Sequence, residues 1–515
     1  MESYILCIDQ GTTSTKAFLL NEGGGMIPGA PVPIKQIYPV PGYVEHSPEE
    51  IYTSVLKAVA NLLAEHPEAM GEIAAIGITN QRETTIAFGR HTLKSAYNAI
   101  VWQCRRTADI CRREEIASAS DKIFEKTGLK IDPYFSATKM RWIIENRPDI
   151  KEAVAAGDIL FATVDGYLVY RLTDKRSFKT DYSNASRTML FNINTLDYDD
   201  ELLELFDIPR HCLAKACPSC SDFGAVELHK DELIDLGLTD IESDHLVRLN
   251  GVHIMACIGD QPSALFGQNA LSKGDSKTTY GTGCFTLMNT GDKPVFSGDG
   301  LLTSAAWSYN GVTTYALEGS IFQGGSIISW LKDELKLIEH PADTDPICRS
   351  VEDNGGVYLV PAFTGLGAPY WNPDARGVFT GLTRGCSAAH IVRASVESII
   401  YQVTDLIELM RKDTGVESNE MKVDGGVCAS EFLMQLQADL LGIKIIRAKS
   451  DEMTAQGAGL LAGLSCGYFK DIDEVTALYA ARTEYTPSMS EVQKIKLMDG
   501  YHRAVKAALA WEESK

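Results

Sequence analysis

The sequence contains no uncharged apolar run of about 20 residues, the length that a membrane-spanning helix requires. Its first residues lead straight into a short apolar segment, without a basic region or a small-residue cleavage site. Neither a membrane anchor nor a secretion signal is indicated by these residues. We therefore expect a cytoplasmic protein that has no membrane partner.

Positive charge is also scarce, because 48 Lys and Arg stand against 69 Asp and Glu, giving a net charge of −21 and a pI near 5.0. A chain this acidic is repelled by nucleic-acid phosphates and by anionic lipid surfaces. We therefore expect no nucleic acid among its partners. An anionic substrate would have to be met by local hydrogen-bond donors and by Mg²⁺.

Paired metal-binding cysteines are lacking as well. The 12 cysteines are scattered, and most lie inside apolar segments, where a reduced thiol packs as a small apolar side chain. Cys217 and Cys220 form one Cys-x-x-Cys pair, but no second ligand pair follows at zinc spacing. We expect loop thiols there, with a structural metal as the alternative.

What the chain does have is length, since 515 residues exceed what one core usually supports and predict two domains of roughly 250 residues. Ser47-Pro48 indicates the start of a helix, and Ser387 and Gly415 indicate the ends of a long one. Residues 218–248 are acidic and are predicted to be loop-like, without chemistry.

The most informative stretch is residues 4–20. Apolar strands at 4–8 and 17–20 enclose a turn of small polar residues, the pattern of a β-hairpin. Glycine lets a ligand approach the turn, and its N–H groups, hydroxyls and lysine suit a polyphosphate. Asp9 is placed to hold a metal ion or its water. An ordinary hairpin fits equally well. The candidate phosphate contacts are Thr12, Thr13, Ser14 and Lys16.

A second stretch repeats this pattern in the other half of the chain. Residues 278–288 again read strand, Gly-Thr turn and strand, with Gly281-Thr282 in the place of Gly11-Thr12. Two related hairpins in two halves predict a duplicated domain that holds nucleotide phosphates between its copies.

Two further apolar strands, at 73–78 and 252–258, place charged residues at their C-terminal ends, where open α/β sheets bind ligands. Arg82 donates and Glu83 accepts hydrogen bonds, so together they suit neighbouring hydroxyls of a polyol. Asp260 is placed to act as a general base. The alternatives are a salt-bridged surface turn for Arg82-Glu83 and a helix cap for Asp260.

Aromatic residues and a glycine pair complete the candidates. Trp102 suits the wall of a pocket for a ligand's carbon chain, although a tryptophan is more often part of a core. Tyr134 either lends its hydroxyl to the pocket or packs a helix against a loop. Gly425-Gly426 opens a helix, so that the backbone can lie against the base or the α-phosphate of a nucleotide.

Taken together, these stretches resemble the FGGY carbohydrate kinases over nearly the whole chain. The resemblance implies an α/β fold with two actin-like (ribonuclease H-like) domains that flank an ATP cleft. We expect an N-terminal domain at residues 1–265 and a C-terminal, nucleotide-binding domain at 266–515. The motifs that carry the resemblance are residues 9–15, 77–85, 102–107, 132–136, 279–285, 361–371 and 424–426, with signature patterns at 134–146 and 377–397.

The resemblance also implies phosphoryl transfer from MgATP to a terminal hydroxyl of glycerol, with Asp260 as catalytic base and Asp9 as the Mg²⁺-associated carboxylate. The implied substrate contacts are Arg82, Glu83, Trp102, Tyr134, Asp260, Gln261 and Phe285. The implied nucleotide contacts are Thr12, Thr13, Ser14, Lys16, Thr282, Gly325, Ser329, Gly426 and Ser430. Lys16 stands where the family's bacterial pattern has arginine, and Ser329 and Ser430 replace a glutamine and an asparagine.

Two other functions remain open from the sequence. A related kinase acting on a longer polyol or a ketose would share the two hairpins. An actin-like ATPase that assembles or clamps partners would need the hairpins but not Arg82-Glu83. Because the family often forms dimers and tetramers, we expect a homodimer or homotetramer by analogy.

Overall fold

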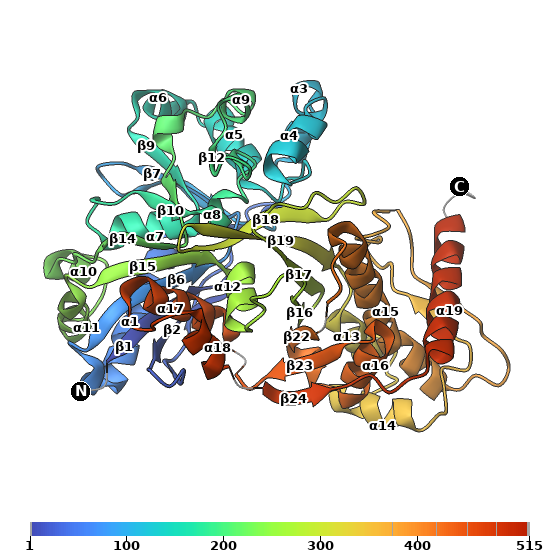
Figure 1. Cartoon of the computed structure of the whole chain (residues 1–515). Helices are drawn as coiled ribbons and strands as arrows, with labels where there is room; N and C mark the ends of the chain where they lie inside the picture. Colours follow the sequence, from blue (N-terminus) through green and yellow to red (C-terminus); the bar gives the residue numbers. More distant parts are fainter. Residues whose placement is uncertain (1–2, 373, 419, 451, 480, 512–515) are drawn as a thin grey trace.

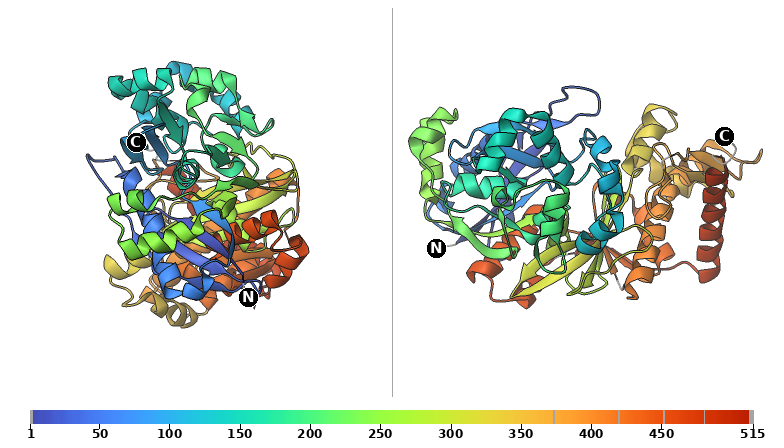
Figure 2. Two further views of the ribbon diagram at one scale, coloured as in Figure 1. Left: turned by 90° about the vertical axis from the view of Figure 1, so that its left-hand side faces the viewer. Right: turned by 90° about the horizontal axis from the view of Figure 1, so that it is seen from above.

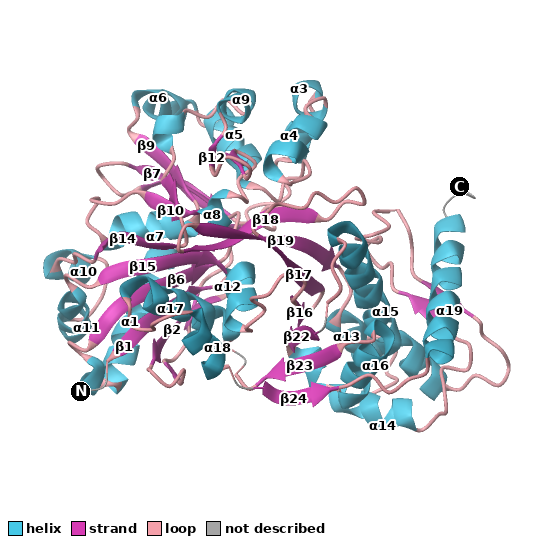
Figure 3. Ribbon diagram, in the orientation of Figure 1, coloured by secondary structure: helices cyan, strands magenta, loops and turns pink. Residues whose placement is uncertain are grey.

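The computed structural model describes residues 3–372, 374–418, 420–450, 452–479 and 481–511. Two mixed sheets, each of seven strands within these residues, form the centres of the two halves of the molecule (Figure 1). Helices surround both sheets (Figure 3). None of the helices in the described ranges combines the length and the apolar character needed to span a bilayer.

The first sheet has the strand order β14-β15-β6-β1-β2-β3, and β4 also pairs with β2. Its strands are β1 (Tyr4–Gln10), β2 (Ser14–Leu20), β3 (Met26–Pro28), β4 (Val32–Pro33), β6 (Ile73–Asn80), β14 (Cys220–Ala225) and β15 (His253–Gly259).

The second sheet has the order β18-β19-β17-β16-β22-β23-β24. Its strands are β16 (Ser276–Tyr280), β17 (Cys284–Gly291), β18 (Leu302–Tyr309), β19 (Val312–Ile321), β22 (Glu420–Asp424), β23 (Lys444–Ala448) and β24 (Ala481–Tyr485).

The two sheets share one pairing pattern. β1 is antiparallel to β2 and parallel to β6, β6 is parallel to β15, and β15 is antiparallel to β14. β16, β17, β22, β23 and β24 pair in the same order and with the same directions. The duplication predicted from the two hairpins is therefore confirmed in the topology, with each hairpin at the same place in its sheet.

The first sheet is buried on both faces. Leu6 and Ile8 of β1 pack in one cluster with α1 (Pro48–Glu65), while Ile5 and Cys7 pack in another with α17 (Met453–Cys466). Because side chains alternate between the faces of a strand, this explains why residues 4–8 of β1 are all apolar. The predicted start of α1 is confirmed, since Ser47 accepts a hydrogen bond from the Glu50 N–H.

Helix α17 comes late in the chain but packs on the first sheet, against β1, β6 and β15 and against α12 (Asp260–Gly267). Small residues make this contact close: a Cβ at Gly459 would overlap the Cys7 Sγ, and one at Gly77 would overlap the Ala458 carbonyl. The domain boundary expected between residues 265 and 266 stays a prediction, and α17 belongs spatially to the first sheet.

A smaller sheet with the order β5-β8-β7-β9 caps the first half, at the top of Figure 1. Its core is shared with α4, α5 and α6. The strands are β5 (Glu45–His46), β7 (Thr85–Gly89), β8 (Ser95–Ile100) and β9 (Ile159–Ala162), and the helices are α4 (Ser120–Thr127), α5 (Ser136–Asn146), α6 (Pro148–Ala156), α7 (Val164–Leu172) and α8 (Tyr182–Ala185).

In the second half, helices cover the sheet and extend away from it (Figure 2). The long helix α15 follows Ser387 and ends at Gly415, whose φ of 61° is left-handed, so both predicted ends are confirmed. The helices are α13 (Gly325–Asp333), α14 (Thr344–Arg349), α15 (Ala388–Thr414), α16 (Glu431–Leu441), α18 (Ile472–Leu478) and α19 (Glu491–Ala510).

The loop predicted at residues 218–248 is wrong, because this segment forms β14, α10 (Lys230–Asp235) and α11 (Asp240–Leu246). A capping box at Thr239 starts α11, which packs on α1. Cys217 and Cys220 likewise lie in strands rather than loops, in β13 (Lys215–Cys217) and β14. Within the described residues, neither cysteine belongs to a cluster of potential metal ligands.

Candidate active site

The two predicted phosphate hairpins have related turns, the second one residue shorter than the first. The Gly11 N–H donates to the Ser14 carbonyl at 3.0 Å, and the Gly281 N–H donates to the Gly283 carbonyl at 2.9 Å. The Thr12 hydroxyl accepts a hydrogen bond from the Trp102 indole N–H at 3.0 Å. The first turn is thereby joined to a residue predicted for the substrate pocket, while Thr13 is exposed at its tip.

Around the second turn the structure brings together Thr282, Gly325 and Gly426. The Gly325 N–H, at the start of α13, donates to the Gly281 carbonyl at 2.7 Å, and a Cβ at Gly325 would lie only 2.9 Å from that oxygen. Gly425 has a φ of 94° and packs on the Tyr280 backbone, whereas a Cβ at Gly426 would meet nothing within 4 Å. Bare backbone is thus presented to open space, as a bound nucleotide requires.

The two serines expected among the nucleotide contacts, Ser329 and Ser430, lie in different surroundings. Ser329 is exposed on α13, one turn after Gly325. The Ser430 hydroxyl caps α16 by accepting from the Leu433 N–H at 3.1 Å, and it donates to Asp345. Ser430 is therefore already engaged within the protein through its hydroxyl.

Lys16 and Asp9 face each other across the first hairpin, where they are register partners. The Lys16 ammonium bonds to both Glu452 oxygens, at 2.8 and 3.0 Å, and remains partly exposed. Burial raises the pKa of Asp9 to about 7, with the Asp260 carboxylate adding to this effect and Lys16 opposing it. The desolvated Asp9 carboxylate, with the Asp260 carboxylate near enough to act on it, is an oxygen donor set that fits a hard divalent cation.

The predicted polyol residues Arg82, Glu83 and Asp260 meet beyond the ends of β6 and β15. The Arg82 Nε lies 3.2 Å from the Asp260 Oδ1 and 4.0 Å from the Glu83 Oε1. Arg82 and Glu83 are 2% exposed at their side chains, which excludes the surface salt bridge considered above, while Asp260 is 33% exposed. The base candidate is therefore partly exposed, whereas the Arg82 and Glu83 side chains are almost completely covered.

Sequence reasoning missed two residues that complete this cluster. Glu318 on β19 binds Arg82 through both carboxylate oxygens, at 2.9 and 3.1 Å. Arg187, after α8, donates to the Glu83 Oε1 at 2.5 Å and to Glu318 at 3.2 Å. Burial alone would raise the pKa of Glu318, but the two guanidiniums outweigh it and hold that pKa well below its usual range.

Glu83 has a φ of 60°, a left-handed conformation that is uncommon outside glycine. Its carbonyl is held by the Ser136 hydroxyl at 3.0 Å and by the Lys139 ammonium at 3.4 Å. Burial lowers the pKa of Lys139 to about 8, although nearby acidic groups oppose this effect. These two donors fix the backbone of Glu83 and so orient its carboxylate. The local sequence around Ser136 and Lys139 did not indicate this role.

The aromatic candidates lie beside this cluster. The Trp102 and Tyr134 rings meet edge to face with centroids 5.7 Å apart, and the Arg187 guanidinium lies 5.5 Å from the Tyr134 ring centroid. Phe285, on β17, is partly exposed and pairs with Ser320 of β19, two residues after Glu318. Trp102 and Tyr134 thus contact the charged cluster through Arg187. Phe285 is near it only by its pairing with β19, the strand that carries Glu318.

Gln261, on α12, faces the second sheet. The buried Lys277 of β16 donates to its Oε1 at 2.6 Å and to the Thr279 hydroxyl at 3.0 Å. Because the amide oxygen is occupied by an ammonium, the Gln261 amide presents its N–H donors elsewhere. Lys277 is a further residue of this region that the sequence analysis did not identify.

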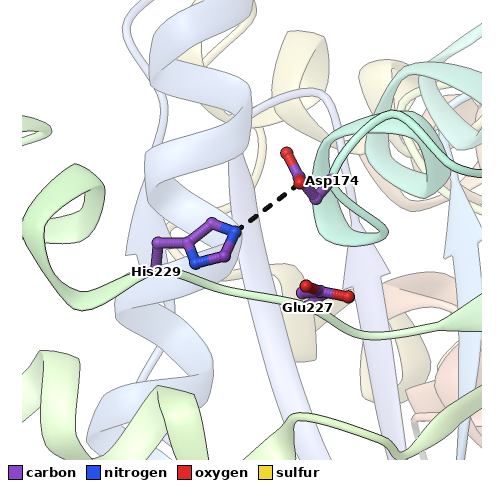
Figure 4. Close-up of side chains that lie close together, drawn as sticks. All are labelled: Asp174, Glu227 and His229. Atoms are coloured by element: carbon purple, nitrogen blue, oxygen red, sulfur yellow. Dashed lines mark ion pairs between the residues drawn. The ribbon is translucent and has the colours of Figure 1, made fainter.

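A separate surface cluster offers potential metal ligands, with atoms of Asp174, Glu227 and His229 within 4.8 Å of one another (Figure 4). Arg176 already donates to Glu227 at 2.7 Å, and the Lys175 ammonium lies 3.5 Å from Asp174. Two cations therefore balance the carboxylates, and we assign this cluster no role.

Comparison with known proteins decides the family. Residues 4–267 match the N-terminal domain, and residues 277–466 the C-terminal domain, of the FGGY family of carbohydrate kinases. The chain belongs to this family. The resemblance inferred from the motifs, the α/β fold and the kinase class are thereby confirmed.

Individual members of the FGGY family align over nearly the full length. A glycerol kinase from Symbiobacterium thermophilum is 47% identical over 510 residues, covering 99% of each chain. The crystal structure of Plasmodium falciparum glycerol kinase with ADP is 35% identical, with a TM-score of 0.91, and covers 99% of this chain and 98% of that one. A xylulose kinase from Lactobacillus acidophilus, 24% identical over the same shares with a TM-score of 0.86, shows the same fold.

Proposed function

We propose that the chain transfers the terminal phosphoryl group of ATP to a terminal hydroxyl of glycerol, giving sn-glycerol 3-phosphate and ADP, as the first step of glycerol catabolism. The observation that carries this proposal is the cluster of Arg82, Glu83 and Asp260, in a chain 47% identical to a glycerol kinase along its whole length. A small polyol fits because the cluster offers one donor and two acceptors within a few ångströms of each other.

In the proposed mechanism Asp260 removes the proton from the attacking hydroxyl. Its partial exposure and its place at the first turn of α12 leave it free to approach the substrate. Arg82 donates to a substrate oxygen and Glu83 accepts from a neighbouring hydroxyl, so that one end of the polyol faces the base. Trp102, Tyr134 and Phe285 exclude water along the carbon chain, and the Gln261 amide adds a donor.

On the other side, Thr12, Thr13, Ser14 and Thr282 would contact the phosphates, with Gly325 and Gly426 allowing the nucleotide to approach. Lys16, Ser329 and Ser430 are the further nucleotide candidates. Asp9 would hold Mg²⁺, which neutralises charge on the β- and γ-phosphates when it is bound. Catalysis then depends mainly on positioning and electrostatics.

The test is ADP release from ATP by the purified protein with glycerol, erythritol, xylitol, xylulose or no acceptor. We expect strong dependence on glycerol and formation of glycerol 3-phosphate, both abolished when Mg²⁺ is chelated. Preference for a longer polyol would leave the kinase class intact but overturn the proposed substrate. ADP release that ignores every acceptor would favour an ATPase instead.

We also propose a cytoplasmic homodimer or homotetramer. This assignment follows family analogy alone. Light scattering of the purified chain tests the oligomeric state, and a monomer at micromolar concentration would contradict it.

A further inference from the structure

We propose that Glu318 and Arg187 are positioning residues for the acceptor: Glu318, supplied by the second sheet, holds both guanidiniums of the polyol site and through Arg187 fixes the carboxylate of Glu83. This inference rests on the proposed function, since it concerns the same site. It assigns the second sheet a part in selecting the acceptor as well as in binding the nucleotide.

Glu318 extends from the second sheet to the polyol site. It lies on β19, in the sheet that carries the second phosphate hairpin, and its side chain is 2% exposed. It contacts Arg82 with both oxygens and Arg187 with one. A carboxylate that binds two guanidiniums at once leaves neither free to rotate, because the planar fork of arginine fixes the geometry.

Arg187 links Glu318 to Glu83 and so fixes the position of the Glu83 carboxylate. Arg187 is fully buried, and its Nε donates to the Glu83 Oε1 at 2.5 Å, while its Nη1 donates to the Ser304 hydroxyl at 2.9 Å. Among the described residues, no donor is hydrogen-bonded to the other carboxylate oxygen of Glu83. Arg187 therefore uses one oxygen of Glu83 as an anchor and leaves the second for a substrate hydroxyl.

The balance of charge in this cluster depends on Glu318. Arg82 and Arg187 carry two positive charges, and Glu83 and Glu318 carry two negative ones, so this buried group of four is neutral as a whole. Without the Glu318 charge, two buried guanidiniums would share one buried carboxylate. Arg82 would then be drawn toward its nearer remaining partner, Asp260, which lies 3.2 Å away, while the Glu83 Oε1 lies at 4.0 Å. Loss of Glu318 therefore displaces the acceptor site and leaves the nucleotide turns in place.

The test compares Glu318→Gln with the wild-type enzyme and with a matched control, Glu45→Gln. Glu45 forms an equally buried pair with Arg106, at 2.6 Å and with side chains 3% and 0% exposed, and it contacts none of the proposed acceptor residues. We expect Glu318→Gln to lower kcat/KM for glycerol about 10- to 100-fold, the loss typical of a misplaced reactive group, with KM for ATP changed less than about twofold. Glu45→Gln should leave both KM values near those of the wild type.

If Glu318 had only a structural role, its loss would lower kcat/KM for glycerol and for ATP by the same factor, in proportion to the folded fraction. The inference is overturned if Glu318→Gln keeps the wild-type kcat/KM for glycerol, or if Glu45→Gln lowers that ratio equally. Should Glu318→Gln not fold, Ser304→Ala removes only one hydrogen bond to Arg187, and it should raise KM for glycerol about threefold without changing KM for ATP. An unchanged KM for glycerol in that variant would likewise overturn the inference.

The proposed function and this inference can fail separately. A wild-type enzyme that prefers another polyol refutes glycerol as the acceptor, and the role of Glu318 is then decided by the effect of Glu318→Gln on kcat/KM for the preferred polyol.

Discussion

Strands β6 and β22 occupy the same place in the two sheets, each parallel to the first strand of its phosphate hairpin. The residues after the two strands differ. After β6 come Arg82 and Glu83, two buried ionised side chains, whereas after β22 come Gly425 and Gly426, which are exposed backbone without side chains. One duplicated scaffold thus supplies hydrogen-bonding side chains for a small acceptor in one copy and space for a large nucleotide in the other.

The largest effect should come from the acceptor side of this comparison. Asp260→Asn keeps the shape of the side chain but removes the proposed base, so kcat should fall by about 10² to 10⁴. Steady-state kinetics with glycerol and ATP measure this. Asp199→Asn, which changes a carboxylate paired with Lys126 on another surface, is the control. Turnover at the wild-type rate in Asp260→Asn would refute the assignment of the base.

The nucleotide side should respond to Gly426→Ala. A Cβ there meets no protein atom within 4 Å, so stability should not change, but the methyl group would occupy space assigned to ATP. We expect KM for ATP to rise about 10- to 100-fold, the range of a steric clash, while KM for glycerol stays constant. Gly298→Ala, at an equally open glycine, is the matched control. Equal KM values for ATP in both variants would contradict the placement of the nucleotide.

Lys16 of the first hairpin has two candidate roles. It is paired with Glu452 in the structure, and it is also expected to contact the phosphates of ATP. If it contacts ATP, Lys16→Gln should raise KM for ATP about fivefold, the loss of one modest hydrogen bond. Glu452→Gln breaks the same partly exposed pair but leaves the ammonium, so its KM for ATP should stay at the wild-type value or fall. Equal increases in both variants would instead show that the ion pair itself matters.

The smallest effect, a pH-dependent change in Tm, concerns the contact between His502 and Asp405 in the second half of the molecule. His502 on α19 bonds to Asp405 of α15 at 2.7 Å, and Asp405 also accepts from the Tyr370 hydroxyl at 2.6 Å. The hydrogen bond to Asp405 raises the pKa of His502. A raised pKa in the folded state stabilises the protein below the ordinary histidine pKa of about 6.5, and this contribution is lost as the pH rises through the folded value.

Thermal unfolding between pH about 5.5 and 8.5 tests this contact. The wild-type Tm should exceed that of His502→Gln at the acidic end by at most about 2 °C, and the difference should shrink toward the alkaline end. His91→Gln, at an exposed turn, should show no such trend. A difference that stays constant with pH would contradict the role of the ion pair.

The sequence predicted those features that local pattern determines. The two hairpins, the start of α1 and both ends of α15 follow from apolar periodicity, caps and glycine, which act over a few residues. Arg82, Glu83 and Asp260 could be proposed because they follow strands, and the structure brings them together.

Other features depend on contacts between distant parts of the chain. Glu318 and Arg187 are separated from their partners by more than a hundred residues, and neither lies in a motif that marks it. Residues 218–248 resemble a loop in sequence because their short helices carry few apolar residues, and these helices depend on packing, α11 against α1 and α10 against α11. Lys16 and Glu452 are 436 residues apart in the sequence, so their hydrogen bond could not be predicted from local pattern either.

The position of α17, late in the chain but packed on the first sheet, also affects how the protein folds during synthesis. Until Cys466 has left the ribosome, the face of the first sheet that α17 covers lacks this helix, so the nascent N-terminal half exposes part of an apolar surface. A fragment that ends at residue 265 should therefore aggregate when expressed alone, and co-expression of the remaining chain should return it to solution. The enzyme is duplicated in architecture but matures as a single unit.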